Sequence, residues 1–129
     1  MVSVDSMTRV MDAFNASFVA GDADAARRCF TQNAVIWHNT DRVEQAVEDW
    51  LGGLKTLVGI LPVRRIDVVQ RDVFPGFCVQ QQEIIGRNAW NRPVQIRTCI
   101  LCRFSASGVI QRLDEYLDSA AMTQLTAKD

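Results

Sequence analysis

The sequence has 129 residues, of which 48% are hydrophobic and 22% charged, and its formal net charge is −1. This composition is typical of a globular protein, so we expect one domain over residues 1–129. The small net charge, without a long basic run, argues against nucleic-acid binding. No apolar stretch reaches the roughly 18 residues of a membrane span. The N-terminal segment lacks the pattern of a signal peptide, which predicts a cytoplasmic protein.

The first half of the chain predicts three helices and one strand. A first amphipathic helix contains apolar residues every three or four positions and ends at Gly21. Asp22 caps a short second helix through Ala25, Ala26 and Phe30, and the segment AVIWH then predicts a strand. Asp41 followed by Glu44 has the form of a capping box, so we expect a third helix to begin there. The apolar residues of the first and third helices include Met7, Met11, Phe14, Phe18, Val47, Trp50, Leu51 and Leu54.

From residue 62 onward the sequence alternates between apolar and polar residues and predicts strands. The four strands are expected over residues 63–73, 77–86, 94–104 and 109–117, with a short last helix from Ser119. Turn-forming sequences rich in Pro, Gly, Asn and Ser separate the strands. Helices followed by hairpin-linked strands indicate an α+β fold, with helices on one face of an antiparallel sheet.

The four cysteines do not indicate a metal site. Cys99 and Cys102 form a C-x-x-C sequence inside a predicted strand, where residues three apart point to opposite faces. With one histidine in the chain and no second paired-cysteine motif, we expect buried thiols and no metal. The chain also lacks a glycine-rich phosphate loop, so we expect no organic cofactor.

Glu115 is the first candidate for a catalytic residue. Strand alternation places it on one face with Leu113 and Leu117. A carboxylate among leucines must be paired, protonated or open to a cavity, because an isolated buried charge is costly. A solvated position at the sheet edge is the alternative interpretation.

The single histidine, His38, is the second candidate, since an imidazole is a natural acid or base at neutral pH. A structural histidine is the alternative. Strand alternation places Trp37 and Asn39 on one face and His38 on the other. Asn39 is either a polar group in an apolar cavity or a residue that only turns the chain.

Three consecutive glutamines, residues 80–82, are unusual in a strand because they place amides on both faces. At least one of them is therefore expected to line a cavity or a subunit interface. Gln80 and Gln82 share one face, and Gln81 shares the other with Glu83. The sequence alone leaves open which face is which.

The order of the elements, with AVIWHNTD after two helices and VIQRLDEYLD near the C-terminus, resembles the SnoaL-like branch of the NTF2-like superfamily over roughly residues 5–125. The resemblance implies a curved antiparallel sheet folded as a cone around an internal pocket, with N-terminal helices closing the wide end. It also implies that Trp37 and Asn39 face the pocket and that the sheet forms a homodimer.

The motifs are also similar to those of limonene-1,2-epoxide hydrolases. A Tyr-His-Asn pattern of that group corresponds to Trp37-His38-Asn39, and its catalytic Asp in the last strand corresponds to Glu115. Its Arg-x-Asp pair falls near Gln81 and Glu83. Indole cannot accept a hydrogen bond from water, and glutamine cannot polarise an epoxide oxygen as a guanidinium does. The resemblance therefore does not extend to epoxide hydrolysis.

Together with the candidate residues, the resemblance implies a cofactor-independent enzyme that acts on a hydrophobic cyclic molecule of the polyketide or terpenoid type. Its acid–base chemistry would be that of an isomerase, cyclase, dehydratase or hydrolase, with Glu115, His38 and Asn39 as catalytic residues. The residues expected to bind substrate are Trp37, Gln82, Glu83, Phe14, Phe18, Trp50, Leu54 and Leu113. The alternative function is a non-catalytic small-molecule-binding or dimerisation domain.

Overall fold

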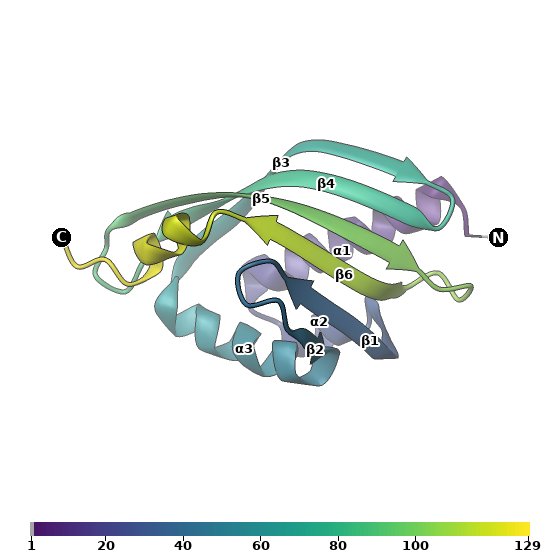
Figure 1. Ribbon diagram of the computed structural model, residues 1–129, viewed down its shortest axis with the longest axis horizontal. Coiled ribbons are helices and arrows are strands. Elements are labelled where there is room, and N and C mark those ends of the chain that lie inside the picture. Colours follow the sequence, from purple (N-terminus) through teal and green to yellow (C-terminus); the bar gives the residue numbers. More distant parts are fainter. Residues whose placement is uncertain (1) are drawn as a thin grey trace.

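The computed structural model describes residues 2–129 and shows a six-stranded sheet with helices on one side (Figure 1). The helices are α1 (Val4–Ala20), α2 (Ala23–Arg27), α3 (Val47–Ile60) and the 3-10 helix η1 (Ser119–Leu125). The strands are β1 (Phe30–His38), β2 (Glu44–Ala46), β3 (Val63–Phe74), β4 (Phe77–Arg87), β5 (Pro93–Phe104) and β6 (Ile110–Leu117). The expected α+β fold with a curved, open sheet is confirmed.

The strand order in the sheet is β2-β1-β6-β5-β4-β3, and each pair is antiparallel except β1 with β6. The long strands β3 to β6 bend over the helices, so the sheet has a concave inner face and a convex outer face (Figure 1). Helices α1 and α3 lie on the inner side. Strand β1 is the first strand of the chain and β6 is the last, so their parallel pairing brings residues from distant parts of the sequence side by side.

The helix boundaries follow from local chemistry. Ser3 caps α1 by accepting a hydrogen bond from the Ser6 amide at 3.1 Å. Gly21 ends α1 at a φ of +68°, and a Cβ there would lie 2.5 Å from Val58 Cγ2, so glycine suits both the conformation and the space. Asp22 caps α2, as expected, through the Ala25 amide at 3.0 Å. The expected extension of that helix to Phe30 is wrong, because α2 ends at Arg27 and Phe30 begins β1.

The expected capping box at Asp41 and Glu44 is wrong. Glu44 belongs to β2, which pairs with the edge of β1 and places Glu44 opposite Trp37. Asp41 accepts a hydrogen bond from the Val43 amide at 3.0 Å and so stabilises a turn rather than a helix start. Helix α3 begins at Val47 without a side-chain cap. Pairing with β1 satisfies the backbone groups of this segment, which removes the need for an earlier helical turn.

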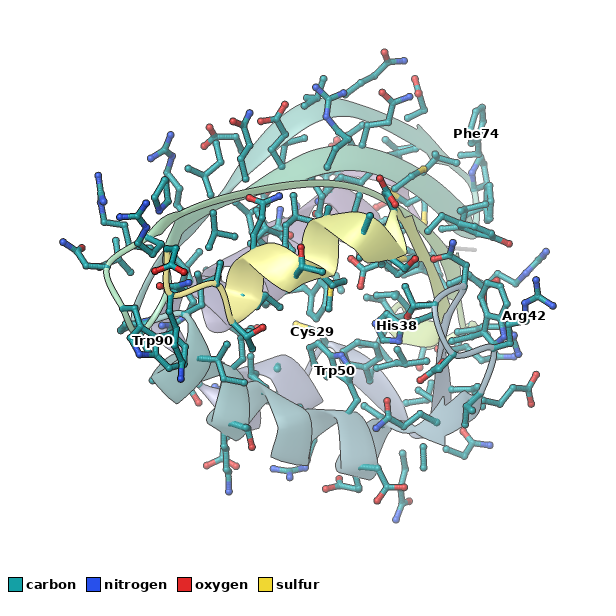
Figure 2. All side chains as sticks on the ribbon, turned by 60° about the vertical axis from the view of Figure 1, so that its left-hand side comes forward. Cys29, His38, Arg42, Trp50, Phe74 and Trp90 are labelled. Carbon is teal, nitrogen blue, oxygen red and sulfur yellow. The ribbon has the colours of Figure 1, made fainter. Side chains whose placement is uncertain are left out.

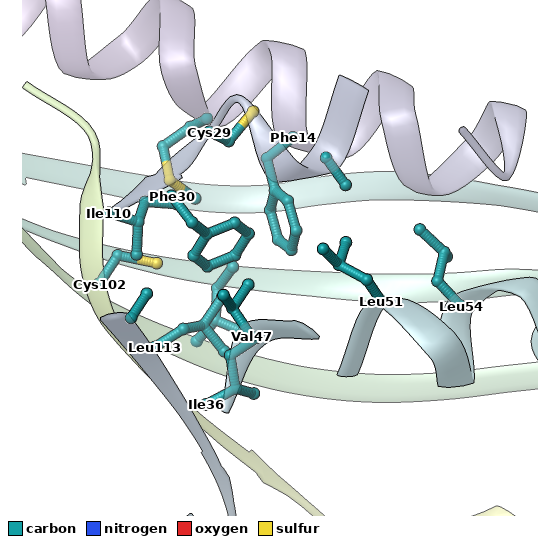
Figure 3. Close-up of a cluster of buried hydrophobic side chains, with 14 of the residues drawn as sticks. Phe14, Cys29, Phe30, Ile36, Val47, Leu51, Leu54, Cys102, Ile110 and Leu113 are labelled. Atoms are coloured by element: carbon teal, nitrogen blue, oxygen red, sulfur yellow. The ribbon is translucent and has the colours of Figure 1, made fainter. Parts of the chain in front are cut away.

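The hydrophobic core fills the space between the inner face and the helices. Its main cluster includes Phe14, Phe30, Ile36 and Leu51, and the Phe14 and Phe30 rings meet edge to face with centroids 5.4 Å apart (Figure 3). A smaller cluster of Leu61, Val94 and Ile96 lies toward η1. The four cysteines are free thiols. No helix among the described residues is long and apolar enough to span a membrane.

Candidate active site

A cavity of about 290 Å³ lies between the inner face of the sheet and the helices α1, α3 and η1. Most of its lining is apolar and comes from both core clusters. Six of the residues that the sequence assigns to substrate binding contribute to the lining: Phe14, Phe18, Trp50, Leu54, Gln82 and Leu113. Residues Met122 and Leu125 of η1 complete one side, so the last helix of the chain closes part of the cavity.

Among residues 2–129, His38 and Glu115 are the only basic and acidic side chains that line the cavity, and they contact each other. Their strands are parallel neighbours, and the register places the two residues side by side. His38 Nε2 lies 3.0 Å from Glu115 Oε1, and the two side chains are 21% and 17% exposed. This contact raises the pKa of His38 above 6.5, against the opposing effect of burial. Figure 2 shows His38 directed toward the interior, on the same side of the sheet as Trp50.

The expected orientation of strand β1 is wrong, because the structure places His38 on the inner face. Ala34 and Ile36 are buried on that face, and His38 continues the same alternation into the cavity. Trp37 instead packs edge to face against Tyr116 of β6, with ring centroids 5.3 Å apart. Trp37 is therefore not part of the cavity lining.

Asn39 also lies outside the lining and has a structural contact in place of the expected catalytic one. Its side-chain amide pairs with the backbone of Leu117: Nδ2 donates to the carbonyl at 3.1 Å, and Oδ1 accepts from the amide at 3.0 Å. The Asn39 amide also donates to the Glu115 carbonyl at 3.1 Å. These bonds extend the β1–β6 pairing by one residue, so Asn39 holds the strand ends that carry His38 and Glu115.

The structure resolves which glutamines face inward. Gln80 and Gln82 are buried, and Gln82 lines the cavity. Glu83 consequently faces outward, which corrects its assignment to the substrate site. Its carboxylate accepts hydrogen bonds from Arg97 Nη2 and Gln95 Nε2, both at 2.6 Å. The Arg97 contact, followed by the Gln95 contact, lowers the pKa of Glu83.

The sequence interpretation missed three polar residues of the lining: Thr98, Thr40 and Gln45. Thr98 lies directly opposite Gln82 in the β4–β5 pair. Its position between the inward residues Ile96 and Ile100 was readable from strand alternation. Thr40 and Gln45 lie in the segment that we expected to lead into α3.

Among residues 2–129, no group of three or more His, Cys, Asp or Glu side chains is arranged to hold a metal ion.

No protein-family model matches the chain, and no curated protein matches it in sequence. Solved structures do match its fold. TsrD from Streptomyces laurentii has a TM-score of 0.82 and 16% identity, over 97% of this chain and 98% of that chain. A protein from Jannaschia sp. CCS1 that is named as a SnoaL-like polyketide cyclase has a TM-score of 0.79 and 16% identity, over 95% and 93% of the two chains. An LEH-like epoxide hydrolase from M. tuberculosis has a TM-score of 0.76 and 14% identity, over 95% and 90%. The chain therefore shares the fold of these proteins, and this is the cone fold that the sequence resemblance implies.

Proposed function

We propose that the protein is a cofactor-independent enzyme that moves a proton on a hydrophobic cyclic molecule of the polyketide or terpenoid type. The observation that carries this proposal is the His38–Glu115 pair, at 3.0 Å, on the wall of an apolar cavity. A titratable pair at the edge of a concave apolar site is the arrangement that acid–base catalysis requires.

In this proposal Glu115 accepts a proton from a carbon of the substrate, and the electron pair of that C–H bond moves into the substrate. Return of the proton to another substrate atom completes an isomerisation, or a ring closure where the substrate carries an internal electrophile. His38 is 21% exposed, so its imidazole can exchange the proton with solvent. Its raised pKa allows the ring to hold a proton near neutral pH.

The size and lining of the cavity limit the substrate. A volume of about 290 Å³ is at the lower end of the range of small-molecule sites, roughly 300–1,000 Å³, and suits a molecule of one to three rings. The names of two structural neighbours, a SnoaL-like polyketide cyclase and an LEH-like epoxide hydrolase, support a hydrophobic small molecule as the substrate. No arginine among residues 2–129 lines the cavity, so we do not propose epoxide hydrolysis. The homodimer through the sheet stays a prediction.

Proton exchange on a model ketone tests the proposal. The bicyclic ketone 1-tetralone is incubated with the protein in D₂O, and loss of the proton signal next to the carbonyl is followed by NMR. We expect the protein to accelerate the exchange, and Glu115→Gln to reduce the acceleration by about 100-fold or more, since positioned acid–base groups contribute roughly 10²–10⁴-fold. Glu83→Gln is the matched control, because it makes the same change on the outer face and should leave the rate within about 2-fold of wild type.

Two results would count against the proposal. Equal exchange by wild type and Glu115→Gln would remove Glu115 from the chemistry. Saturable binding of 1-tetralone without any acceleration of exchange would favour the alternative function, a non-catalytic ligand-binding domain.

A further inference from the structure

A chain of hydrogen bonds fixes the orientation of the Gln82 side chain in the cavity wall. Arg71 Nε donates to Gln80 Oε1 at 2.8 Å, and a guanidinium can only donate. The amide nitrogen of Gln80 is therefore the donor in its other contacts. It donates to Gln82 Oε1 at 2.6 Å and to Asn15 Oδ1 at 3.3 Å. Arg71 is itself held by Asp12, at 2.8 Å.

The remaining group of this chain is the amide nitrogen of Gln82. Its oxygen points toward Gln80 and accepts a hydrogen bond from it, which leaves the amide nitrogen, with its two N–H groups, as the free donor of the Gln82 side chain. Gln82 is only 4% exposed and lines the cavity. Among residues 2–129, Gln82 takes part in a side-chain hydrogen bond only as the acceptor from Gln80, so its Nε2 has no partner within the protein.

A second polar group without a partner lies beside it. Thr98 faces Gln82 across the β4–β5 pair and also lines the cavity. The residue is 3% exposed, and its buried hydroxyl makes no hydrogen bond with any residue of 2–129. Buried polar groups are satisfied in the great majority of cases, so a hydroxyl without a protein partner in a cavity wall calls for a partner inside the cavity, either water or an atom of a ligand.

We propose that Gln82 Nε2 and Thr98 Oγ1 together bind the carbonyl oxygen of a cyclic ketone, an inference that rests on the proposed function of the cavity. A carbonyl oxygen has two lone pairs and accepts two hydrogen bonds, which matches two neighbouring donors. A ligand carboxylate fits less well, because no Arg or Lys among residues 2–129 lines the cavity and Glu115 is close by.

The position of this donor pair also suits the chemistry. Glu115 lies opposite Ile100 on β6, and Thr98 is two residues from Ile100 on the same face of β5. Strand spacing and rise place the backbones of Thr98 and Glu115 on the order of 8 Å apart. This distance accommodates a carbonyl group and the carbon next to it between the two side chains. When Glu115 takes the proton of that carbon, the electron pair moves to the oxygen, and the two donors stabilise the enolate.

The test compares 1-tetralone with tetralin, which has the same rings without the oxygen. Affinities are measured by NMR titration for wild type, Gln82→Leu and Thr98→Val. We expect each substitution to weaken 1-tetralone binding by about 3- to 10-fold, the usual effect of one lost hydrogen bond, and to leave tetralin binding unchanged or tighter. Thr98→Ser keeps the hydroxyl and should retain the ketone affinity. Unchanged tetralin binding shows that the cavity is intact in the variants.

The carbonyl carbon of ¹³C-labelled 1-tetralone gives an independent readout. Its resonance should move downfield on binding to wild type and return toward the value in an apolar solvent in Gln82→Leu. An equal ratio of ketone to hydrocarbon affinity in wild type, Gln82→Leu and Thr98→Val would overturn the inference.

The failure of this inference is distinguishable from failure of the proposed function. Glu115→Gln should reduce the acceleration of proton exchange by about 100-fold or more but preserve the preference for the ketone. If exchange is lost in Glu115→Gln while Gln82→Leu has no effect on ketone affinity, the donor pair is wrong and the acid–base pair stands. If ketone affinity depends on Gln82 but exchange is absent in wild type, the donor pair stands as a binding site without catalysis.

Discussion

Two glutamates on opposite faces of the same sheet show what distinguishes the candidate active site from the rest of the surface. Glu115 on the inner face and Glu83 on the outer face have nearly equal side-chain exposures, 17% and 18%. Glu83 is covered mainly by its own partners, and its neighbour Arg97 is 58% exposed to solvent. Glu115 is covered by a cavity wall. Limited exposure alone therefore does not identify a functional carboxylate.

The partners of the two glutamates differ more than their exposure. Glu83 contacts a guanidinium, which stays protonated at any accessible pH, and this contact lowers the pKa of Glu83. Its charge is therefore fixed. Glu115 contacts His38, whose own protonation changes near neutral pH. Of the two pairs, only the inner one contains an imidazole, the side chain whose charge changes near neutral pH, and only that pair lines the cavity.

Substitutions that remove packing should show the largest difference between the two faces. Ile36 on the inner face of β1 is 0% exposed, and Ile36→Ala should lower the free energy of unfolding by about 2–5 kcal/mol. Val69 of β3 is 49% exposed, and Val69→Ala should change it by less than about 0.5 kcal/mol. Urea unfolding followed by tryptophan fluorescence measures both. A similar loss for the two variants would contradict the assignment of the core to the inner face.

Titration of His38 should show the next largest effect. As the only histidine in the chain, it gives a single imidazole Cε1–H signal in NMR spectra. The contact with Glu115 is the main cause that raises the pKa of His38, and burial opposes it. Glu115→Gln removes the first effect and leaves the second, so the pKa of His38 should fall. Glu83→Gln should leave it unchanged. An unaltered pKa in Glu115→Gln would mean that the 3.0 Å contact is not formed in solution.

The raised pKa of His38 also makes the free energy of unfolding depend on pH. The pKa of His38 is higher in the folded than in the unfolded state, where it is near 6.5. The stability that comes from protonated His38 is therefore fully present below pH 6.5, and it is lost as the pH rises through the folded-state value. His38→Gln should remove this part of the pH dependence, which urea unfolding at a series of pH values would show.

Most of the fold could be predicted from the sequence because the sheet has one buried and one solvent-facing side. Strand β4 was expected over residues 77–86 and is observed over Phe77–Arg87, since turn-forming residues bound it on both sides. The helix end at Gly21 followed from glycine's tolerance of a positive φ. Strand β2 was missed because only three residues form it, and its pairing with β1 depends on contacts that local patterns do not contain.

The site was predicted less completely, because alternation gives the period of a strand but not which face is inside. The segment of Val35, Ile36 and Trp37 is apolar on both faces, since Trp37 packs against Tyr116 on the outer side. The family resemblance assigned Trp37 and Asn39 to the pocket and left His38 on the opposite face of the strand, whereas the structure places His38 on the cavity lining. Glu115 was identified correctly as an inward residue because leucines flank it on the same face.

The outer ion pair should contribute least, and its response to salt separates it from the inner pair. The lowered pKa of Glu83 means that its contribution is present above the unfolded-state pKa and is lost as the pH falls through the folded-state value. Glu83→Gln lacks this contribution and should therefore begin to unfold in acid at a slightly higher pH than wild type. Because the pair faces solvent, the difference should disappear at about 1 M NaCl, where charges are screened within about 3 Å. Acid titration by circular dichroism at low and high salt measures this, with Glu115→Gln for comparison. A difference that persists in high salt would mean that Glu83 is shielded from solvent ions as well as Glu115 is. The two faces would then differ only in the partner of the glutamate, which is His38 on the inner face and Arg97 on the outer face.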